Sequence, residues 1–121
     1  MFKVIVAGSE DFEDMELMES VLEEFLPKNI EIEIVIQGNR GASQLAERYS
    51  YHNNLNLKII RANWDAFGKE AGYRRNEEMT EYADALVAFW NGKSKGIKDL
   101  IYEARKQRKR VHVERYEPVS T

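Results

Sequence analysis

The sequence predicts a single α/β domain with a five-stranded, mainly parallel sheet that is covered by helices on both faces. Short apolar, often β-branched stretches alternate along the chain with stretches of helical periodicity, and this order produces parallel sheets. Glycine-bearing loops follow three of the apolar stretches and open into helices. A length of 121 residues corresponds to one domain, 1–121, whose last few residues we expect to form a flexible tail.

The first third of the chain predicts two strands and one helix. The β-branched run 2–7, ended by Gly8, is typical of a strand buried on both faces. From Asp11 apolar residues recur at helical spacing until Pro27 ends the helix. The segment 31–37 alternates Glu with Ile and predicts the second strand.

The middle of the chain predicts a helix, a strand and a less regular segment. Apolar residues in 42–49 follow the i, i+3, i+4, i+7 pattern of a helix. Residues 55–60 predict the third strand. The stretch 61–71 has no clear periodicity and is predicted to be irregular, which in small domains is typical of functional loops. A helix is expected over 73–82.

The last third predicts two strands that flank a helix. Residues 85–90 form an apolar run typical of a strand, and 91–96 form a turn-rich loop. Apolar residues at helical spacing in 97–104 predict the next helix, with Leu100 on its buried face. A short final strand is expected over 111–113.

Composition excludes several classes of chemistry. Apolar residues make up 43% and charged residues 32%, which is typical of a soluble globular protein. The chain has no cysteine, so disulfides, thiolate metal sites and cysteine nucleophiles are excluded. Only two histidines, His52 and His112, are present, and we therefore predict no metal site and no cofactor.

Charge and hydropathy indicate where the protein acts. The net charge of −3 provides no global attraction to nucleic acid or to an anionic membrane. No apolar run approaches the ~20 residues needed to cross a bilayer, and the first residues lack the pattern of a signal peptide. We expect a cytoplasmic protein that does not contact membranes.

Three glycine-bearing loops, 8–11, 38–41 and 91–96, indicate an anion site. Ligands of open α/β sheets bind beyond the carboxyl ends of the strands. Helix N-termini there offer free N–H groups and a partial positive charge, and glycine lets a ligand approach the backbone. One such loop is explained by the turn alone, but three, two of which carry Lys or Arg, favour a nucleotide-like ligand.

The loops are expected to play different roles. Carboxylates of Glu10 and Asp11 repel phosphate, so the first loop is expected to lie against ribose or base, and the last loop to hold phosphate. The chain contains neither G-x-x-x-x-G-K-[ST] nor G-x-G-x-x-G. The expected binding residues of these two loops are Gly8, Ser9, Gly92, Lys93, Ser94 and Gly96.

Further candidates lie outside these two loops. Arg74 and Arg75 are adjacent near a helix start and point in different directions, so one of them is able to face the pocket. Arg40, Gly41 and Arg75 are expected to complete the anion site. Trp64 suits either stacking on a base or covering an edge of the sheet.

Several blocks resemble the DUF2493 group of the SLOG superfamily, whose domains are Rossmann-like. The resemblance runs from about Phe2 to Val113 and rests on Arg40-Gly41-Ala42, Trp64 with Gly68-Lys69, Ala71-Gly72-Tyr73-Arg74-Arg75-Asn76 with Met79, the run from Asp84 to Trp90, and Gly92-Lys93-Ser94-Lys95-Gly96. It implies a nucleotide or nucleotide-derived ligand and, by analogy with LOG-like relatives, a homodimer or higher homo-oligomer. The chain departs from the group at Glu10, where Arg is common, and at Ser43, where Asp is common.

The resemblance also bears on catalysis, because the superfamily includes the LOG phosphoribohydrolases. Arg75 matches their catalytic arginine. Aligning their Gly-Gly-x-Gly-Thr-x-x-Glu loop on Gly96 places Leu100 at the catalytic glutamate position, and leucine has no acid–base chemistry.

Three hypotheses follow. The first is a module that binds a nucleotide-derived signal without turnover, with no catalytic residue. The second is a nucleotide phosphoribohydrolase or N-glycosidase whose carboxylate comes from Glu10, Asp11 or Asp99. The third is an interaction or nucleic-acid protein that uses the basic run 105–110. The net charge and the preference of cations for the last turn of a helix count against the third.

Overall fold

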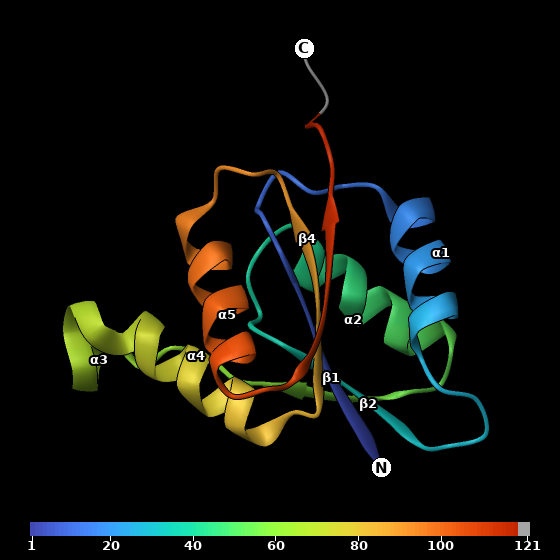
Figure 1. Ribbon diagram of the computed structural model, residues 1–121, viewed down its shortest axis with the longest axis horizontal. Coiled ribbons are helices and arrows are strands. Elements are labelled where there is room, and N and C mark those ends of the chain that lie inside the picture. The colour runs from blue at the N-terminus through green and yellow to red at the C-terminus, as the bar shows by residue number, and fades with distance from the viewer. Residues whose placement is uncertain (119–121) are drawn as a thin grey trace.

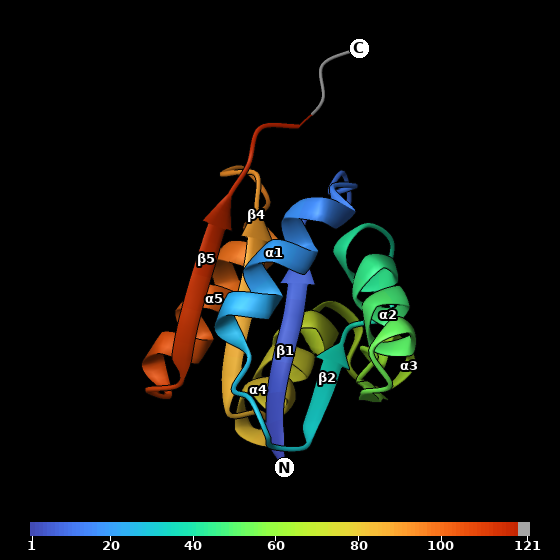
Figure 2. The same ribbon diagram turned by 90° about the vertical axis from the view of Figure 1, so that its right-hand side faces the viewer.

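A five-stranded sheet in the order β3-β2-β1-β4-β5 forms the centre of the computed structural model, which describes residues 1–118. All neighbouring strands are parallel, with Ile5 of the central strand opposite Val35 on one side and Leu86 on the other. The predicted α/β fold is therefore confirmed (Figure 2). The strands are β1 (Phe2–Gly8), β2 (Ile32–Ile36), β3 (Asn56–Ile59), β4 (Ala85–Trp90) and β5 (Arg110–Arg115).

Helices cover both faces of the sheet (Figure 1). One face is covered by α1 (Met15–Phe25) and α2 (Ala42–His52), and the other by α4 (Ala71–Tyr82) and α5 (Lys95–Lys106). The short helix α3 (Trp64–Phe67) and the 3₁₀ turn η1 (Gly68–Glu70) project from the end of α4. None of the helices among the described residues has the length and hydropathy required to cross a membrane.

The core lies in two layers because successive side chains of a strand point to opposite faces. Val4 and Val6 of β1 pack in the cluster beneath α1 and α2. Ile5 and Ala7 pack in the cluster beneath α4 and α5. All four side chains are at most 1% exposed, which explains why this strand is apolar throughout.

The strand order determines where a ligand can bind. The chain moves outward from β1 to β2 and β3, then crosses back to place β4 on the other side of β1. The loops that leave β1 and β4 therefore turn to opposite faces of the sheet, and a crevice opens between them. Binding sites of open α/β sheets lie at this switch point.

Some element boundaries differ from the sequence expectation. The stretch 61–71 is largely helical and not irregular, because the Asn63 side chain caps α3 by accepting a hydrogen bond from the Ala66 amide (3.1 Å). Helix α1 begins at Met15, after Asp14, whose carboxylate accepts from the Leu17 amide (3.0 Å). Strand β5 is longer than predicted. The predicted flexible tail lies largely outside the described residues.

Candidate functional site

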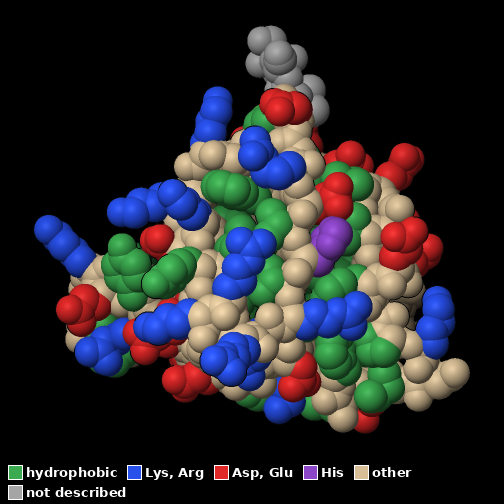
Figure 3. Space-filling model, in the orientation of Figure 1, with side chains coloured by type: hydrophobic (Ala, Val, Ile, Leu, Met, Phe, Trp, Pro, Cys, Tyr) green, Lys and Arg blue, Asp and Glu red, His purple; other side chains and the backbone are tan. Residues whose placement is uncertain are grey.

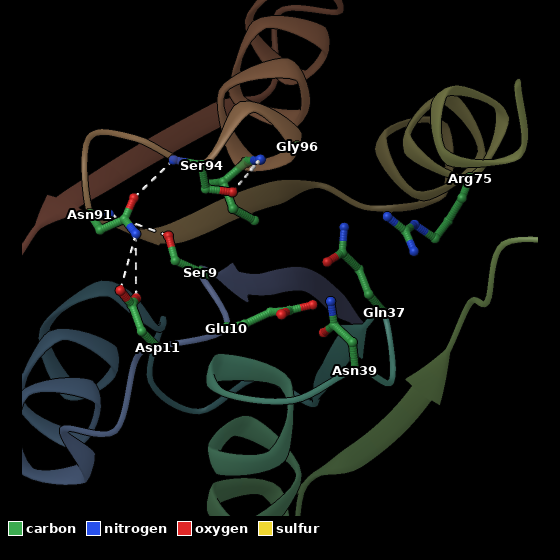
Figure 4. Close-up of a pocket in the computed structure, with 11 residues that line it drawn as sticks. Ser9, Glu10, Asp11, Gln37, Asn39, Arg75, Asn91, Ser94 and Gly96 are labelled. Carbon is green, nitrogen blue, oxygen red and sulfur yellow. Dashed lines mark hydrogen bonds between the residues drawn. The ribbon is translucent and has the colours of Figure 1, made fainter. Parts of the chain in front are cut away.

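A cavity of about 400 Å³ opens at the switch point, above the carboxyl ends of β1 and β4 (Figure 4). Four segments contribute to it: the loop after β1, the loop after β2, the β4–α5 loop with the first turn of α5, and helix α4. The lining residues are Gly8, Ser9, Glu10, Asp11, Gln37, Asn39, Arg75, Asn91, Ser94, Gly96 and Ile97.

The floor of the cavity joins the loops that leave β1 and β4. The Ser9 amide donates to the carbonyl of Phe89 (3.1 Å), and Ser9 Oγ accepts from the amide of Asn91 (3.3 Å). Ser9 is 4% exposed, so it serves both as a link between the strands and as part of the cavity wall. A Cβ on Gly8 would lie 2.6 Å from Ala42 Cβ and 2.7 Å from the Phe89 carbonyl oxygen, so only glycine fits at this position.

Asn91 organises the β4–α5 loop. Its Oδ1 accepts from the amides of Lys93 (2.8 Å) and Ser94 (2.9 Å). Its Nδ2 donates to the Asp11 carboxylate, 3.2 Å from Oδ2. One side chain therefore fixes the shape of this loop and fastens it to the loop after β1 (Figure 4).

The N-terminus of α5 faces the cavity. Ser94 caps the helix, with Oγ accepting from the Ile97 amide (3.4 Å), and the Ser94 carbonyl accepts from Trp90 Nε1 (3.0 Å). A Cβ on Gly96 would meet no atom of the described chain within 4 Å, so the space beside the first turn is open. First-turn amides and the helix dipole together favour an anion at this place.

Arg75 supplies the positive side chain of the cavity. It is half-buried, and its Nε is buried with no hydrogen-bond partner among the described residues. Burial lowers the pKa of Arg75, and no described carboxylate lies within ion-pair distance to oppose that effect. Figure 4 shows its guanidinium directed toward Gln37 across the cavity. Arg74, in contrast, points to solvent, where it pairs with Glu70 (3.5 Å) and lies over the Phe67 ring.

The two carboxylates of the cavity, Asp11 and Glu10, differ in their hydrogen bonding. Asp11 accepts hydrogen bonds from Asn91 Nδ2 and from the Tyr116 hydroxyl. Burial and the bond to Asp11 raise the pKa of Tyr116 to about 12. Glu10 is exposed and points into the cavity without a hydrogen-bond partner among residues 1–118 (Figure 4). Glu10 is therefore the carboxylate that is free to accept from ligand hydroxyls.

The structure brings together half of the residues predicted from sequence. Gly8, Ser9, Arg75, Ser94 and Gly96 all line the cavity. Gly41 lies behind the wall, where a Cβ would be 2.7 Å from the carbonyl oxygens of both Ser9 and Glu10.

The other predicted residues lie elsewhere. Gly92, with a φ of 83°, faces the Arg115 guanidinium, and Lys93 is exposed outside the lining. Arg40 lines a second cavity on the far side of the β2–α2 loop. Trp64 on α3 is 60% exposed and lines neither cavity.

Sequence reasoning did not select Gln37, Asn39 and Asn91. Gln37 and Asn91 directly follow β2 and β4, and Asn39 lies two residues after Gln37. A polar residue at the carboxyl end of an interior strand was the signal that could have found them. Gln37 is only 5% exposed. Asn39 is held in place by Ser43, whose hydroxyl donates to Asn39 Oδ1 (2.7 Å).

The position that matches the LOG glutamate belongs to the core. Leu100 is fully buried in the cluster beneath α4 and α5, as its helical spacing predicts. Asp99 does not line the cavity. Among residues 1–118 no three His, Asp or Glu side chains gather in a way that could hold a metal ion.

Comparison with known proteins identifies the family. A sequence profile described as the YspA, cpYpsA-related SLOG family matches residues 2–67. The chain belongs to this SLOG family. It is also 32% identical over 113 residues to the Gene 61 protein of Mycobacterium phage D29, an alignment that covers 88% of this chain and 90% of the phage protein. SLOG membership agrees with the Rossmann-like α/β sheet and with a cavity at its switch point.

Proposed function

We propose that this SLOG protein is a binding module for a phosphate-bearing nucleotide or nucleotide-derived signal, which it senses or sequesters without turnover. The observation that carries the proposal is Arg75. A half-buried guanidinium with an orphaned Nε and no ion-pair partner in the described chain costs free energy, because burial disfavours the charged form. An anionic ligand in the cavity offsets that cost.

The cavity suggests one orientation for such a ligand. Phosphate placed at the α5 N-terminus would accept from first-turn amides beside Gly96 and from the Ser94 hydroxyl, with Arg75 opposite. The free Glu10 carboxylate would accept from a ribose hydroxyl, and the amides of Gln37 and Asn39 would complete the polar wall. These residues support the proposal because they provide donors at one end and an acceptor at the other.

The absence of turnover rests on chemistry at the catalytic position. Loss of a base from a nucleotide develops positive charge on the ribose, and a placed carboxylate is the usual stabiliser. Leu100 is buried in the core and cannot supply it. Arg75 stays protonated and cannot act as a base, and Asp11 already holds two hydrogen bonds.

One observation favours an N-glycosidase as the second candidate. Glu10 is a free carboxylate in the same cavity as Arg75, so it would have to take over the role of the LOG glutamate. Overnight incubation with purine and pyrimidine monophosphates and with NAD, followed by chromatography, separates the two functions. We expect no free base. Base release that disappears in Arg75→Gln would establish the enzyme instead.

The binding test compares two adjacent arginines. Titration calorimetry with AMP and ADP-ribose should show binding that weakens about tenfold or more in Arg75→Gln, since a hydrogen bond to a charged group contributes roughly 1.5–3 kcal/mol. The control Arg74→Gln removes the same charge from the solvent side and should leave affinity unchanged. Equal affinities in wild type and both variants would show that the cavity is not the binding site.

Other parts of the functional interpretation stay predictions. We propose that within the SLOG superfamily the chain belongs to the DUF2493 group, on the blocks that surround Arg75 and Gly96. Cytoplasmic location and a homodimer or higher homo-oligomer are likewise expectations from the sequence and its resemblance.

A further inference from the structure

A second cavity, of about 460 Å³, lies beside the first and is rich in arginine. Its basic side chains come from three segments: Arg40 from the β2–α2 loop, Arg48 from α2 and Arg61 from the connection that follows β3. Glu47 is the one carboxylate in its lining. Three arginines against one glutamate is a local excess of positive charge in a chain whose net charge is −3.

The arginines of this cavity are not neutralised within the described chain. No carboxylate oxygen of residues 1–118 lies within 4.0 Å of Arg40, Arg48 or Arg61. The positions three and four residues from Arg48 on α2 hold no carboxylate, and adjacent helix residues such as Glu47 and Arg48 do not face each other. Unpaired guanidinium groups around one hollow are the arrangement that binds phosphate, because each presents several N–H donors in a planar fork.

Arg61 is held in a defined position. Its Nη1 donates to the carbonyl of Gly38 (3.1 Å), and its guanidinium occupies the space where a Gly38 side chain would be. A Cβ on Gly38 would lie 2.8 Å from Arg61 Nη1, so glycine at this position leaves room for the arginine. Its remaining N–H groups stay available to a ligand.

The two cavities meet at Asn39, which lines both of them. The Ser43 hydroxyl donates to Asn39 Oδ1, so the oxygen end of the amide is occupied and its NH₂ end remains able to donate. Asn39 therefore provides a donor on the boundary between the Arg75 cavity and the arginine-rich cavity. A ligand that extends from one to the other would cross the carboxyl ends of β4, β1 and β2 in turn.

We propose that the arginine-rich cavity is a second anion subsite, and that the ligand is a nucleotide with two phosphate groups separated by its sugar. The inference rests on the proposed function for the first phosphate, which Arg75 and the α5 N-terminus hold. The second phosphate lies among Arg40, Arg48 and Arg61. A mononucleotide with one phosphate occupies only the first cavity.

The test compares AMP with adenosine 3′,5′-bisphosphate, which differ by one phosphate. Amide resonances followed by NMR report each cavity separately. We expect AMP to shift residues that line the first cavity, and the bisphosphate to shift these together with residues 44–48 and Arg61, which border only the second cavity. The bisphosphate should bind about tenfold more tightly or better, as expected for a phosphate held by charged hydrogen bonds.

Arginine variants test whether the tighter binding of the bisphosphate, relative to AMP, depends on the second cavity. In Arg48→Gln/Arg61→Gln the bisphosphate should bind no better than AMP, and AMP should bind as in wild type. Arg48→Gln alone should lose part of the gain without disturbing the Arg61–Gly38 contact. The control Arg74→Gln/Arg105→Gln lowers the net charge equally at exposed positions and should keep the gain.

The outcomes distinguish this proposal from the proposed function. A bisphosphate that binds no better than AMP and leaves residues 44–48 and Arg61 unshifted would overturn the second subsite and leave the first intact. Shifts confined to residues 44–48 and Arg61 would mean that the Arg75 cavity binds no phosphate, and a two-phosphate ligand would be excluded with it. A gain that survives Arg48→Gln/Arg61→Gln would place the second phosphate elsewhere.

Discussion

Two connections of this protein have the composition of binding loops, yet they differ in what surrounds them. The β4–α5 loop lies at the switch point and is fastened by Asn91 to its own backbone and to Asp11. The projecting segment, defined as residues 63–70 with α3 and η1, extends from the body, with Trp64 and Phe67 60% and 43% exposed. Of these two segments, only the β4–α5 loop lines the Arg75 cavity.

The difference shows that position relative to the strand order decides which segment lines the cavity, more than local composition does. The projecting segment carries tryptophan, glycine and lysine, but it leaves β3, an outer strand of the sheet. Helix α4, which follows it, returns to the sheet and places Arg75 in the cavity. Charge is also unevenly spread: in Figure 3 Lys and Arg side chains gather over α5 and β5, and Asp and Glu over α1.

The largest expected effect compares a glutamate placed on the buried face of α5, the helix that the β4–α5 loop enters, with a glutamate placed in the projecting segment. Leu100→Glu buries an unpaired carboxylate in the hydrophobic cluster beneath α4 and α5 and should lower the free energy of unfolding by several kcal/mol. Phe67→Glu lies on exposed α3, where Arg74 is close enough to pair with it, and should change stability by less than about 1 kcal/mol. Urea unfolding measures both. Wild-type stability of Leu100→Glu would show that this position faces water.

The second comparison uses two glycines in nearly the same backbone conformation. Gly41 has φ 77° and ψ −122°, and Gly68 has φ 53° and ψ −128°, so alanine is strained at both by roughly 1–3 kcal/mol. At Gly41 the new Cβ also meets the carbonyl oxygens of Ser9 and Glu10 at 2.7 Å, whereas at Gly68 it meets nothing within 4 Å of the described chain. Gly41→Ala should therefore lose about 1–3 kcal/mol more than Gly68→Ala. Equal losses in thermal unfolding would mean that the loops after β1 and β2 move apart freely.

The third comparison removes a loop asparagine from each region. Asn91→Ala loses two accepted hydrogen bonds and one donated to Asp11, and should cost about 2 kcal/mol of stability. Asn63→Ala loses one helix cap and should cost about 1 kcal/mol. Asn91→Ala should also weaken AMP binding because the α5 N-terminus loses its fixed position. Calorimetry that finds AMP affinity reduced equally by both variants would contradict this separation of the regions.

Sequence reasoning recovered the parts of the fold that local patterns encode. The β-branched run of β1 and the spacing that buries Leu100 both reflect contacts with neighbours on the sheet, so periodicity alone was enough. The helical nature of 61–71 was missed because its turns are too short to show periodicity, and only the cap at Asn63 signals them.

The site was recovered in part, for a physical reason. Periodicity does not give the order of strands, and the order decides that the loop after β2 contributes Gln37 and Asn39 to the same cavity as Asn91. The spacing of Arg74 and Arg75 indicated that they diverge, but not which of them is half-buried. Arg40 was expected beside Arg75, whereas the turn at Gly41 directs it to the neighbouring cavity.

A smaller, pH-dependent effect involves Tyr116, which follows β5 and donates a hydrogen bond to Asp11 in the loop after β1. The pKa of Tyr116 is raised from 10 to about 12, first by burial and then by its bond to Asp11, so the native state favours the neutral phenol. The resulting stabilisation is fully present below pH 10 and is lost as the pH rises from 10 toward 12. Wild type should lose stability over this range more steeply than Tyr116→Phe. Tyr73→Phe, on the exposed side of α4, should keep the wild-type slope.

The smallest effect separates the two tryptophans, Trp90 at the end of β4 beside the β4–α5 loop and Trp64 in the projecting segment. Trp90 donates to the Ser94 carbonyl (3.0 Å) at the N-terminus of α5, so Trp90→Phe should cost about 1 kcal/mol, and Trp64→Phe, 60% exposed, should cost less than about 0.5 kcal/mol. Each variant leaves a single tryptophan, whose emission is followed with excitation at about 295 nm, where tyrosine hardly absorbs. AMP bound in the cavity should change the emission of Trp90, measured in Trp64→Phe, because the phosphate lies beside Ser94. The emission of Trp64, measured in Trp90→Phe, should stay constant. If Trp64 responds instead, a base stacks on the projecting segment, and that segment closes over the ligand as part of the site.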